Sequence, residues 1–217
     1  MIASFIHKDD TEIVKRLETI RSTFWIAGGA PLNWYQNLPA DSDIDIYFKS
    51  EKDFNKLNDA LTAAYETDEF EVTEPGYFTL FSAAKKKTKK LFAGDVTVEH
   101  IHTTENAITY TVSIDKDHPT WKIQLIKRRY YDTIKDVIDD FDITVCQIAL
   151  DNCIEPVVGP QFAEDVAAKR LRFNKLSPGS AKRLIKYWTY GYTPSDNTLQ
   201  LVIDYPELDL KVSENDY

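Results

Sequence analysis

The segment that most constrains how this chain can fold is DSDIDIYF, at positions 41–48. Within it, Asp43, Asp45 and Tyr47 alternate strictly with large apolar residues. Successive side chains of an extended chain point to opposite faces, so an alternating segment forms a strand with one buried face. The sequence therefore predicts a strand that is anchored in the core by its apolar residues and presents both carboxylates on the same side.

A short apolar segment, FWIA at 24–27, comes before it and ends in Gly28 and Gly29. This pattern predicts a buried strand that runs into a tight turn, and Pro31 suits the first turn of a following helix. Glycines let the backbone approach a ligand closely, and N–H groups at a helix N-terminus bind phosphate oxygens. We therefore expect Gly28 and Gly29 to bind the phosphates of a nucleotide.

The two aspartates of the strand are like charges on one face, and they repel each other unless a cation lies between them. Magnesium binds carboxylate oxygens and often keeps substrate phosphates as further ligands. Taken singly, a double glycine is usually only a turn, and a pair of aspartates usually faces solvent. Together the two features predict a site for Mg²⁺ or Mn²⁺ and a nucleotide, with Asp43 and Asp45 as metal ligands.

The rest of the chain is mixed α and β up to about residue 150 and helical beyond it. Apolar spacing predicts helices over 10–22, 31–37, 51–65, 130–139 and 160–173, another from Ser177 to Gly191, and a last short helix after Thr193-Pro194. Extended segments are expected over 77–82, 95–102, 107–114, 121–126 and 141–150. The fold class is therefore α+β, with a core domain over 1–150 and a small helical C-terminal subdomain over 151–217.

The 217 residues include 26 Lys or Arg and 35 Asp or Glu, a net charge of −9, which argues against nonspecific binding to duplex nucleic acid. The two cysteines, Cys146 and Cys153, are too few for a disulfide framework or a cysteine-rich zinc site. No apolar run approaches the ~18 residues that cross a bilayer, and the N-terminus does not resemble a signal peptide. We expect a cytoplasmic protein with no membrane segment; the sequence indicates no oligomeric state.

The basic residues are unevenly distributed. They gather in three places: Lys85–Lys90, Lys127–Arg129 and the stretch from Lys169 to Lys186, which has no acidic residue. The first run is interpreted either as a solubilising loop or as a phosphate contact with an RNA or polyphosphate substrate.

The segment FWIAGGA at 24–30, followed by DSDIDIYF, resembles the nucleotidyltransferase superfamily that has the DNA polymerase β palm. The signature of that superfamily is hG[GS], a variable helix and then h[DE]h[DE]h. The resemblance is firm over about 25–48 and weaker up to about 150, and the GGA triplet looks like that of tRNA CCA-adding enzymes and poly(A) polymerases. It implies a mixed sheet flanked by helices and a metal-dependent transfer of a nucleoside monophosphate from a nucleoside triphosphate, such as ATP, to a hydroxyl group.

The resemblance also implies a third carboxylate on a later central strand. Asp142, at the start of FDITVCQIAL, is the best match, and it completes the expected catalytic and metal-binding set with Asp43 and Asp45. Asp95 and Glu99, in GDVTVEHIH, are the alternatives. A third carboxylate would complete a two-metal site, with the metals about 3.5–4 Å apart.

In the family, the helical C-terminal part contacts the triphosphate and the base. SPGSAKRLIKYWTYGY is the counterpart here, so Lys182, Lys186 and Tyr190 are expected to bind the nucleotide; the alternative is that these side chains only face water. The acceptor could be an RNA or tRNA end, a protein or a small molecule. The alternative function is a catalytically inactive relative that acts as a nucleotide-binding or protein-interaction module.

Overall fold

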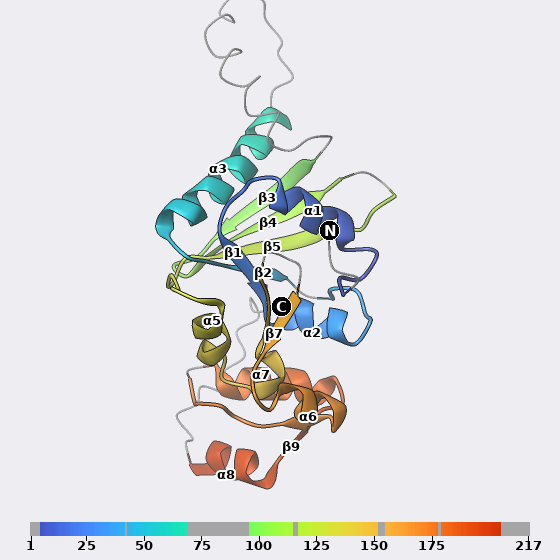
Figure 1. The fold of residues 1–217 in the computed structure, drawn as a ribbon, viewed down its shortest axis with the longest axis vertical. Helices are drawn as coiled ribbons and strands as arrows, with labels where there is room; N and C mark the ends of the chain where they lie inside the picture. Colours follow the sequence, from blue (N-terminus) through green and yellow to red (C-terminus); the bar gives the residue numbers. More distant parts are fainter. Residues whose placement is uncertain are drawn as a thin grey trace, which may run out of the picture.

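A computed structural model describes residues 5–41, 43–68, 96–114, 117–151, 155–177 and 179–204 of the chain. Its main feature is a seven-stranded sheet with the strand order β3-β4-β5-β2-β1-β6-β7 (Figure 1). The strands are β1 (Phe24–Ala27), β2 (Ile44–Phe48), β3 (Thr97–Thr103), β4 (Ala107–Ser113), β5 (Trp121–Ile126), β6 (Ile148–Asp151) and β7 (Glu155–Val158). Neighbours are antiparallel except β2 and β5, which are parallel. The mixed sheet with flanking helices confirms the predicted α+β fold.

Helices cover both faces of this sheet. They are α1 (Thr11–Glu18), α2 (Gly29–Tyr35), α3 (Glu51–Asp68), α5 (Ile134–Asp140), α6 (Phe162–Ala167), α7 (Ser180–Thr189) and α8 (Asp196–Asp204). Apolar residues of α1 and α3 pack with Ile44, Ile46 and Phe48 in the largest core cluster. Residues of α5 pack with Trp25 and Ala27 on the opposite face. None of the helices in the described ranges is long and apolar enough to span a membrane.

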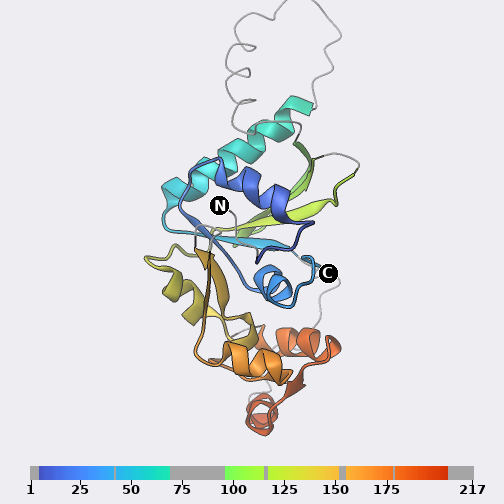
Figure 2. The same ribbon diagram turned by 45° about the vertical axis from the view of Figure 1, so that its right-hand side comes forward.

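The helices α6, α7 and α8 lie together at one end of the molecule, below the sheet (Figures 1 and 2). A second core cluster joins Leu184 and Tyr187 of α7 to Phe162 of α6 and to Val145 and Ile148. A short parallel pair, β8 (Arg170–Leu171) and β9 (Thr193–Pro194), connects this assembly. The strand β7 lies beyond residue 150 but belongs to the main sheet, and the division of the chain at residue 150 stays a prediction.

The alternating strand has the predicted faces. Ile44, Ile46 and Phe48 are fully buried, whereas Asp45 and Tyr47 are partly exposed. Because three buried side chains fix the strand, the carboxylate of Asp45 is held in one place rather than left to move with a loop.

Two predicted elements are wrong in part. The strand expected over 141–150 begins only at β6, because a 3₁₀ turn, η1 (Thr144–Cys146), comes before it. Buried polar groups need partners, and the turn meets this need: Thr144 donates a hydrogen bond to Asp165, and Gln147 donates one to the carbonyl of Ile138. The helix expected over 160–173 ends at Ala167, and Lys169 adopts a left-handed φ of 49°. The strand expected over 77–82 lies outside the described residues.

A buried carboxylate connects the N-terminal part to the rest of the core. Asp10 is 1% exposed and accepts hydrogen bonds from Trp34 Nε1 (2.7 Å), Trp121 Nε1 (2.8 Å) and the amide of Ala40 (2.7 Å). Trp34 belongs to α2 and Trp121 to β5, so this one side chain fixes α2 against the sheet.

Candidate active site

The double-glycine turn lies close to Asp45 of β2, and Asp43 directly precedes that strand. Gly28 precedes α2 with a φ of 87°, a conformation that other residues rarely adopt. A β-carbon at Gly28 would lie 3.8 Å from Asp45 Oδ2 and only 3.1 Å from the ring of Phe141. The glycine therefore allows close packing of the turn, the aspartate and the aromatic ring.

The amide of Gly28 does not fit the role expected from the sequence, since it donates a hydrogen bond to the carbonyl of Ile148 (3.0 Å). That bond continues the β1–β6 pairing past the end of β1. The first N–H groups of a helix have no acceptor within the helix. The expectation of a backbone phosphate contact therefore rests on the start of α2, at Gly29 and Ala30.

Asp45 lies in an environment that opposes its ionisation. Burial and, second, the charge of Asp43 raise its pKa to about 7, while the charge of Lys186 acts in the opposite direction. Repulsion between two carboxylates on one strand face is relieved by a bound cation. Two carboxylates together with substrate phosphates are a common ligand set for Mg²⁺, so the chemistry of these residues fits a magnesium ion.

A side chain outside the predicted site residues lies beside this pair. Gln124 on β5 is in register with Asp45, and its Nε2 donates hydrogen bonds to Asp43 Oδ2 (3.3 Å) and Thr109 Oγ1 (3.1 Å). It lies next to the aspartates only because β2 pairs in parallel with a strand that follows much later. The local sequence of β5 contains no sign of this neighbour.

A cleft of about 670 Å³ opens beside Asp45, within the size range of small-molecule sites. Its walls come from β2, β5, the turn after β3, the loop after β5, the end of α5 and the start of α7. Its polar and aromatic lining includes Asp45, Tyr47, Thr104, Asn106, Gln124, Arg128, Tyr131, Asp140, Phe141, Asp142, Lys175, Ser177 and Arg183.

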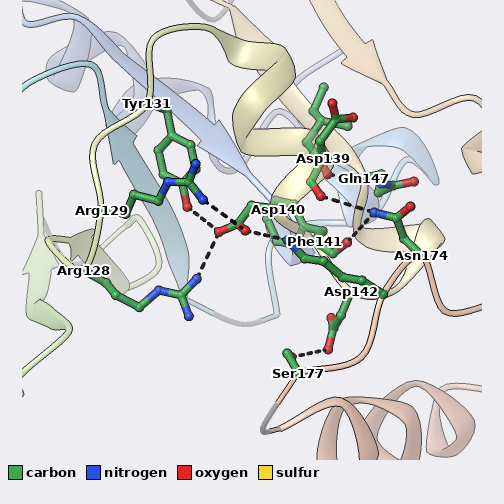
Figure 3. A network of polar contacts seen from close by, with 12 residues as sticks. Arg128, Arg129, Tyr131, Asp139, Asp140, Phe141, Asp142, Gln147, Asn174 and Ser177 are labelled. Carbon is green, nitrogen blue, oxygen red and sulfur yellow. Dashed lines mark hydrogen bonds and ion pairs between the residues drawn. The ribbon is translucent and has the colours of Figure 1, made fainter.

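Asp142 lines the same cleft, but its carboxylate already has partners. It is 2% exposed and accepts hydrogen bonds from Arg183 Nη2 (2.7 Å), Ser180 Oγ (2.6 Å) and Ser177 Oγ (3.1 Å), the last of which is drawn in Figure 3. It precedes a 3₁₀ turn and does not start a strand, so the strand-end argument for this residue was wrong. Its negative charge is balanced by Arg183 in this structure.

The third carboxylate stays a prediction. Among the residues that the structure describes, no three His, Cys, Asp or Glu side chains form a group that could hold a metal ion. Glu99 lies on β3, which β4 and β5 separate from β2, and it accepts a hydrogen bond from Ser113 (2.9 Å). Asp95 and the basic run Lys85–Lys90 lie outside the described residues.

The three nucleotide-binding residues expected in the C-terminal part, two on α7 and Tyr190 directly after it, have different surroundings. Lys186 is exposed and close enough to lower the pKa of Asp45. Tyr190 is 45% exposed, and its ring centre lies 5.9 Å from that of Tyr187. Lys182 is half-buried, and it does not line the cleft. Arg183, which was not selected, is the basic residue of this helix that does.

Four side chains converge on a further carboxylate in the cleft (Figure 3). Asp140 accepts hydrogen bonds from Tyr131 Oη (2.7 Å) and Arg128 Nη2 (3.0 Å), and it forms ion pairs with Lys175 (2.6 Å) and Arg129 (3.6 Å). The basic run Lys127–Arg129 was visible in the sequence. Lys175 belongs to the basic stretch from Lys169 to Lys186, and its pairing with the same carboxylate as Arg128 depends on the fold.

Comparisons with known proteins identify a family, and two solved structures share the fold. A family model described as "Gabija anti-defense 2 family protein" matches residues 1–169. The CCA-adding enzyme of Bacillus stearothermophilus in complex with CTP superposes with a TM-score of 0.55 at 11% identity, covering 93% of this chain and 44% of the enzyme. A tRNA-processing enzyme complex superposes with a TM-score of 0.51 at 12% identity, covering 90% of this chain and 46% of the other. No curated protein sequence matches the chain.

At these identities the solved structures show the fold alone, which is nucleotidyltransferase-like. This chain spans less than half the length of each of them.

Proposed function

This chain belongs to the Gabija anti-defense 2 family, and we propose that it is a magnesium-dependent nucleotidyltransferase that counteracts Gabija defence. It would transfer a nucleoside monophosphate from a nucleoside triphosphate to a hydroxyl group of a molecule on which that defence depends. The family description supports the biological role, and the superposition on a CCA-adding enzyme supports the type of reaction.

One observation carries the chemical part of the proposal. Asp45, which has a raised pKa and lies beside Asp43, faces the cleft at 3.8 Å from the β-carbon position of Gly28. Two neighbouring like charges reduce stability, so the presence of Asp45 in a cleft with Asp43 beside it favours a function that uses the pair.

In the proposed mechanism, Asp43 and Asp45 would hold the metal, and the start of α2 at Gly29 would receive phosphate oxygens. Bound Mg²⁺ would neutralise charge on the triphosphate and lower the pKa of the attacking hydroxyl group. Asp45 must lose its proton before it can act as a ligand, so its raised pKa makes metal binding release a proton near neutral pH. Asp142 could hold a second metal only if Arg183 released its carboxylate.

The decisive experiment incubates the purified chain with each α-³²P-labelled nucleoside triphosphate, Mg²⁺ and an extract of cells that carry Gabija defence. Wild-type protein should label one class of molecule and release pyrophosphate, and Asp45→Asn should abolish both. Asp59→Asn is the matched control, because Asp59 is exposed on α3, away from the cleft. Full labelling by Asp45→Asn would refute the mechanism.

The alternative is a nucleotide-binding module without transferase activity. Two observations favour it. Arg183 forms an ion pair with the carboxylate of Asp142, and the side-chain amide of Gln124 lies beside Asp45 on the neighbouring strand. Such a module would bind a nucleoside triphosphate with Mg²⁺ in a thermal-shift titration and release no pyrophosphate. Protection from Gabija defence that persists in Asp45→Asn would support the module over the enzyme.

A further inference from the structure

The proposed transfer leaves the basic run Lys127–Arg129 without a role, although the fold brings part of it into the cleft. Arg128, Arg129 and Lys175 all pair with Asp140, and we call these four residues the Asp140 cluster. Arg128, Lys175 and Asp140 line the same cleft as Asp45. A site that shares the cleft but not the mechanism is a candidate for binding the second substrate.

The Asp140 cluster has more positive than negative charge. Three cations face one carboxylate, and the acids on either side of it in the sequence have partners of their own: Asp139 pairs with Lys135, and Asp142 with Arg183. A guanidinium group has five donors, and the hydrogen bond of Arg128 to Asp140 uses Nη2. Arg and Lys side chains that converge in this way match the charge and the acceptor oxygens of a phosphate group.

The backbone around the Asp140 cluster is also held in place. The carbonyl of Asn106 accepts hydrogen bonds from the amides of Lys127 (2.9 Å) and Arg128 (3.1 Å). On the other wall, Asn174 donates from its side chain to the carbonyls of Asp139 (3.2 Å) and Phe141 (3.1 Å), which fixes the segment that carries Lys175 (Figure 3). Cations that are positioned before binding lose little freedom when a ligand arrives.

Along β2, the glycine turn is nearer Ile44 and the Asp140 cluster is nearer Tyr47. Ile26 of β1 is in register with Ile46 of the antiparallel β2, so Gly28 is nearest the start of β2. Tyr47 stands about 7 Å further along the same face than Asp45, and its ring packs on Tyr131, which donates to Asp140. A phosphate in the Asp140 cluster would therefore lie towards Tyr47, whereas phosphates at the turn would lie towards Ile44.

We propose that Arg128, Arg129 and Lys175 form a subsite for a phosphate group of the acceptor. The inference rests on the proposed transferase function, and it narrows the acceptor to a phosphate-bearing molecule, either a free nucleotide or a nucleic-acid strand. When it binds, the phosphate would form ion pairs with the three cations that now pair with Asp140.

The test uses the full chain without metal and titrates inorganic phosphate, followed by ³¹P NMR line broadening. Arg128→Gln and Lys175→Gln should each weaken phosphate binding at least fivefold, whereas Asp140→Asn, which removes the competing anion, should tighten it. Lys135→Gln is the matched control, since Lys135 pairs with Asp139 and does not line the cleft. Circular dichroism verifies that each variant is folded. Equal phosphate affinity in the wild type, Arg128→Gln and Lys175→Gln would overturn the subsite.

A second arm identifies the origin of the phosphate. The affinity for a magnesium–nucleoside triphosphate should change less than twofold in Arg128→Gln; a tenfold loss would assign the Asp140 cluster to the triphosphate and overturn the acceptor assignment. AMP and a 5′-phosphorylated hexanucleotide, each compared with its unphosphorylated form, then distinguish a free nucleotide from a strand. If phosphate binding depends on the Asp140 cluster but no nucleotide is ever transferred, the proposed function and the acceptor assignment fail, and only the phosphate site stands.

Discussion

The hydrogen bonds of Asp10 allow a quantitative test of how the site is supported. Asp10→Ala removes the acceptor for Trp34 Nε1, Trp121 Nε1 and the amide of Ala40. The two tryptophans are only 2% and 4% exposed, so water cannot replace the lost acceptor at the indole groups. A buried donor left without a partner costs about 1–3 kcal/mol, and the two indole groups together should cost about 4 kcal/mol. That is a large part of the roughly 5–15 kcal/mol by which folded domains are stable.

The assay is urea unfolding followed by tryptophan fluorescence, with Asp9→Ala as the control. Asp9 is the exposed neighbour of Asp10, and surface substitutions change stability by about 0.5 kcal/mol or less. A double-mutant cycle isolates one bond: Trp34→Phe should cost about 1–2 kcal/mol less in the Asp10→Ala background than in the wild type. A loss below 1 kcal/mol for Asp10→Ala, or no coupling in the cycle, would refute the reasoning. Because Trp34 belongs to α2, Asp10→Ala should also weaken nucleotide binding at the start of that helix.

Three further predictions concern the site itself. The pKa of Asp45 is about 7 in the folded protein against 3.8 for an ordinary aspartate, so the folded protein binds more protons than the unfolded chain between these pH values and loses stability as the pH rises from about 4 to 7. Without metal, Asp45→Asn should therefore be more stable than the wild type by about 2–4 kcal/mol at pH 8. At pH 4 the two proteins should be equally stable, and urea unfolding at both pH values measures the difference. Arg183→Met leaves the buried carboxylate of Asp142 without its cation and should cost about 3–5 kcal/mol in the same assay, with a smaller loss in the double variant Arg183→Met/Asp142→Asn. Gly28→Ala forces a left-handed φ on alanine and places a methyl group 3.1 Å from Phe141, so the melting temperature of the variant should fall. Adding Phe141→Leu should restore part of the loss. An unchanged melting temperature in Gly28→Ala would contradict this geometry.

The two central strands β1 and β2 could be predicted from the sequence because their local patterns of apolar and polar residues reflect which side chains are buried. The alternation in DSDIDIYF corresponds to three buried and two partly exposed residues in β2, and the apolar segment before Gly28 is β1. Each is a short segment whose side-chain period alone determines which face enters the core.

The remaining features depend on contacts between distant segments, which such patterns do not contain. Asp142 looked like a residue at a strand end, but its partners Ser177, Ser180 and Arg183 lie 35, 38 and 41 positions later in the chain. Gln124 lies beside the aspartates only because β2 and β5 are parallel neighbours. Lys182 and Arg183 are adjacent in the sequence, but which of them enters the cleft depends on the packing of α7.

The parallel pairing of β2 with β5 has a consequence for folding. β1 and β2 are close in the sequence, but α3, β3 and β4 lie between β2 and β5, so this pairing closes a long loop and should form late. Until β5 pairs with β2, one edge of β2 has unsatisfied backbone hydrogen-bonding groups that could pair with another chain. Charged side chains on an edge strand disfavour pairing with a second molecule. Asp43 and Asp45 should therefore also keep the partly folded chain from aggregating.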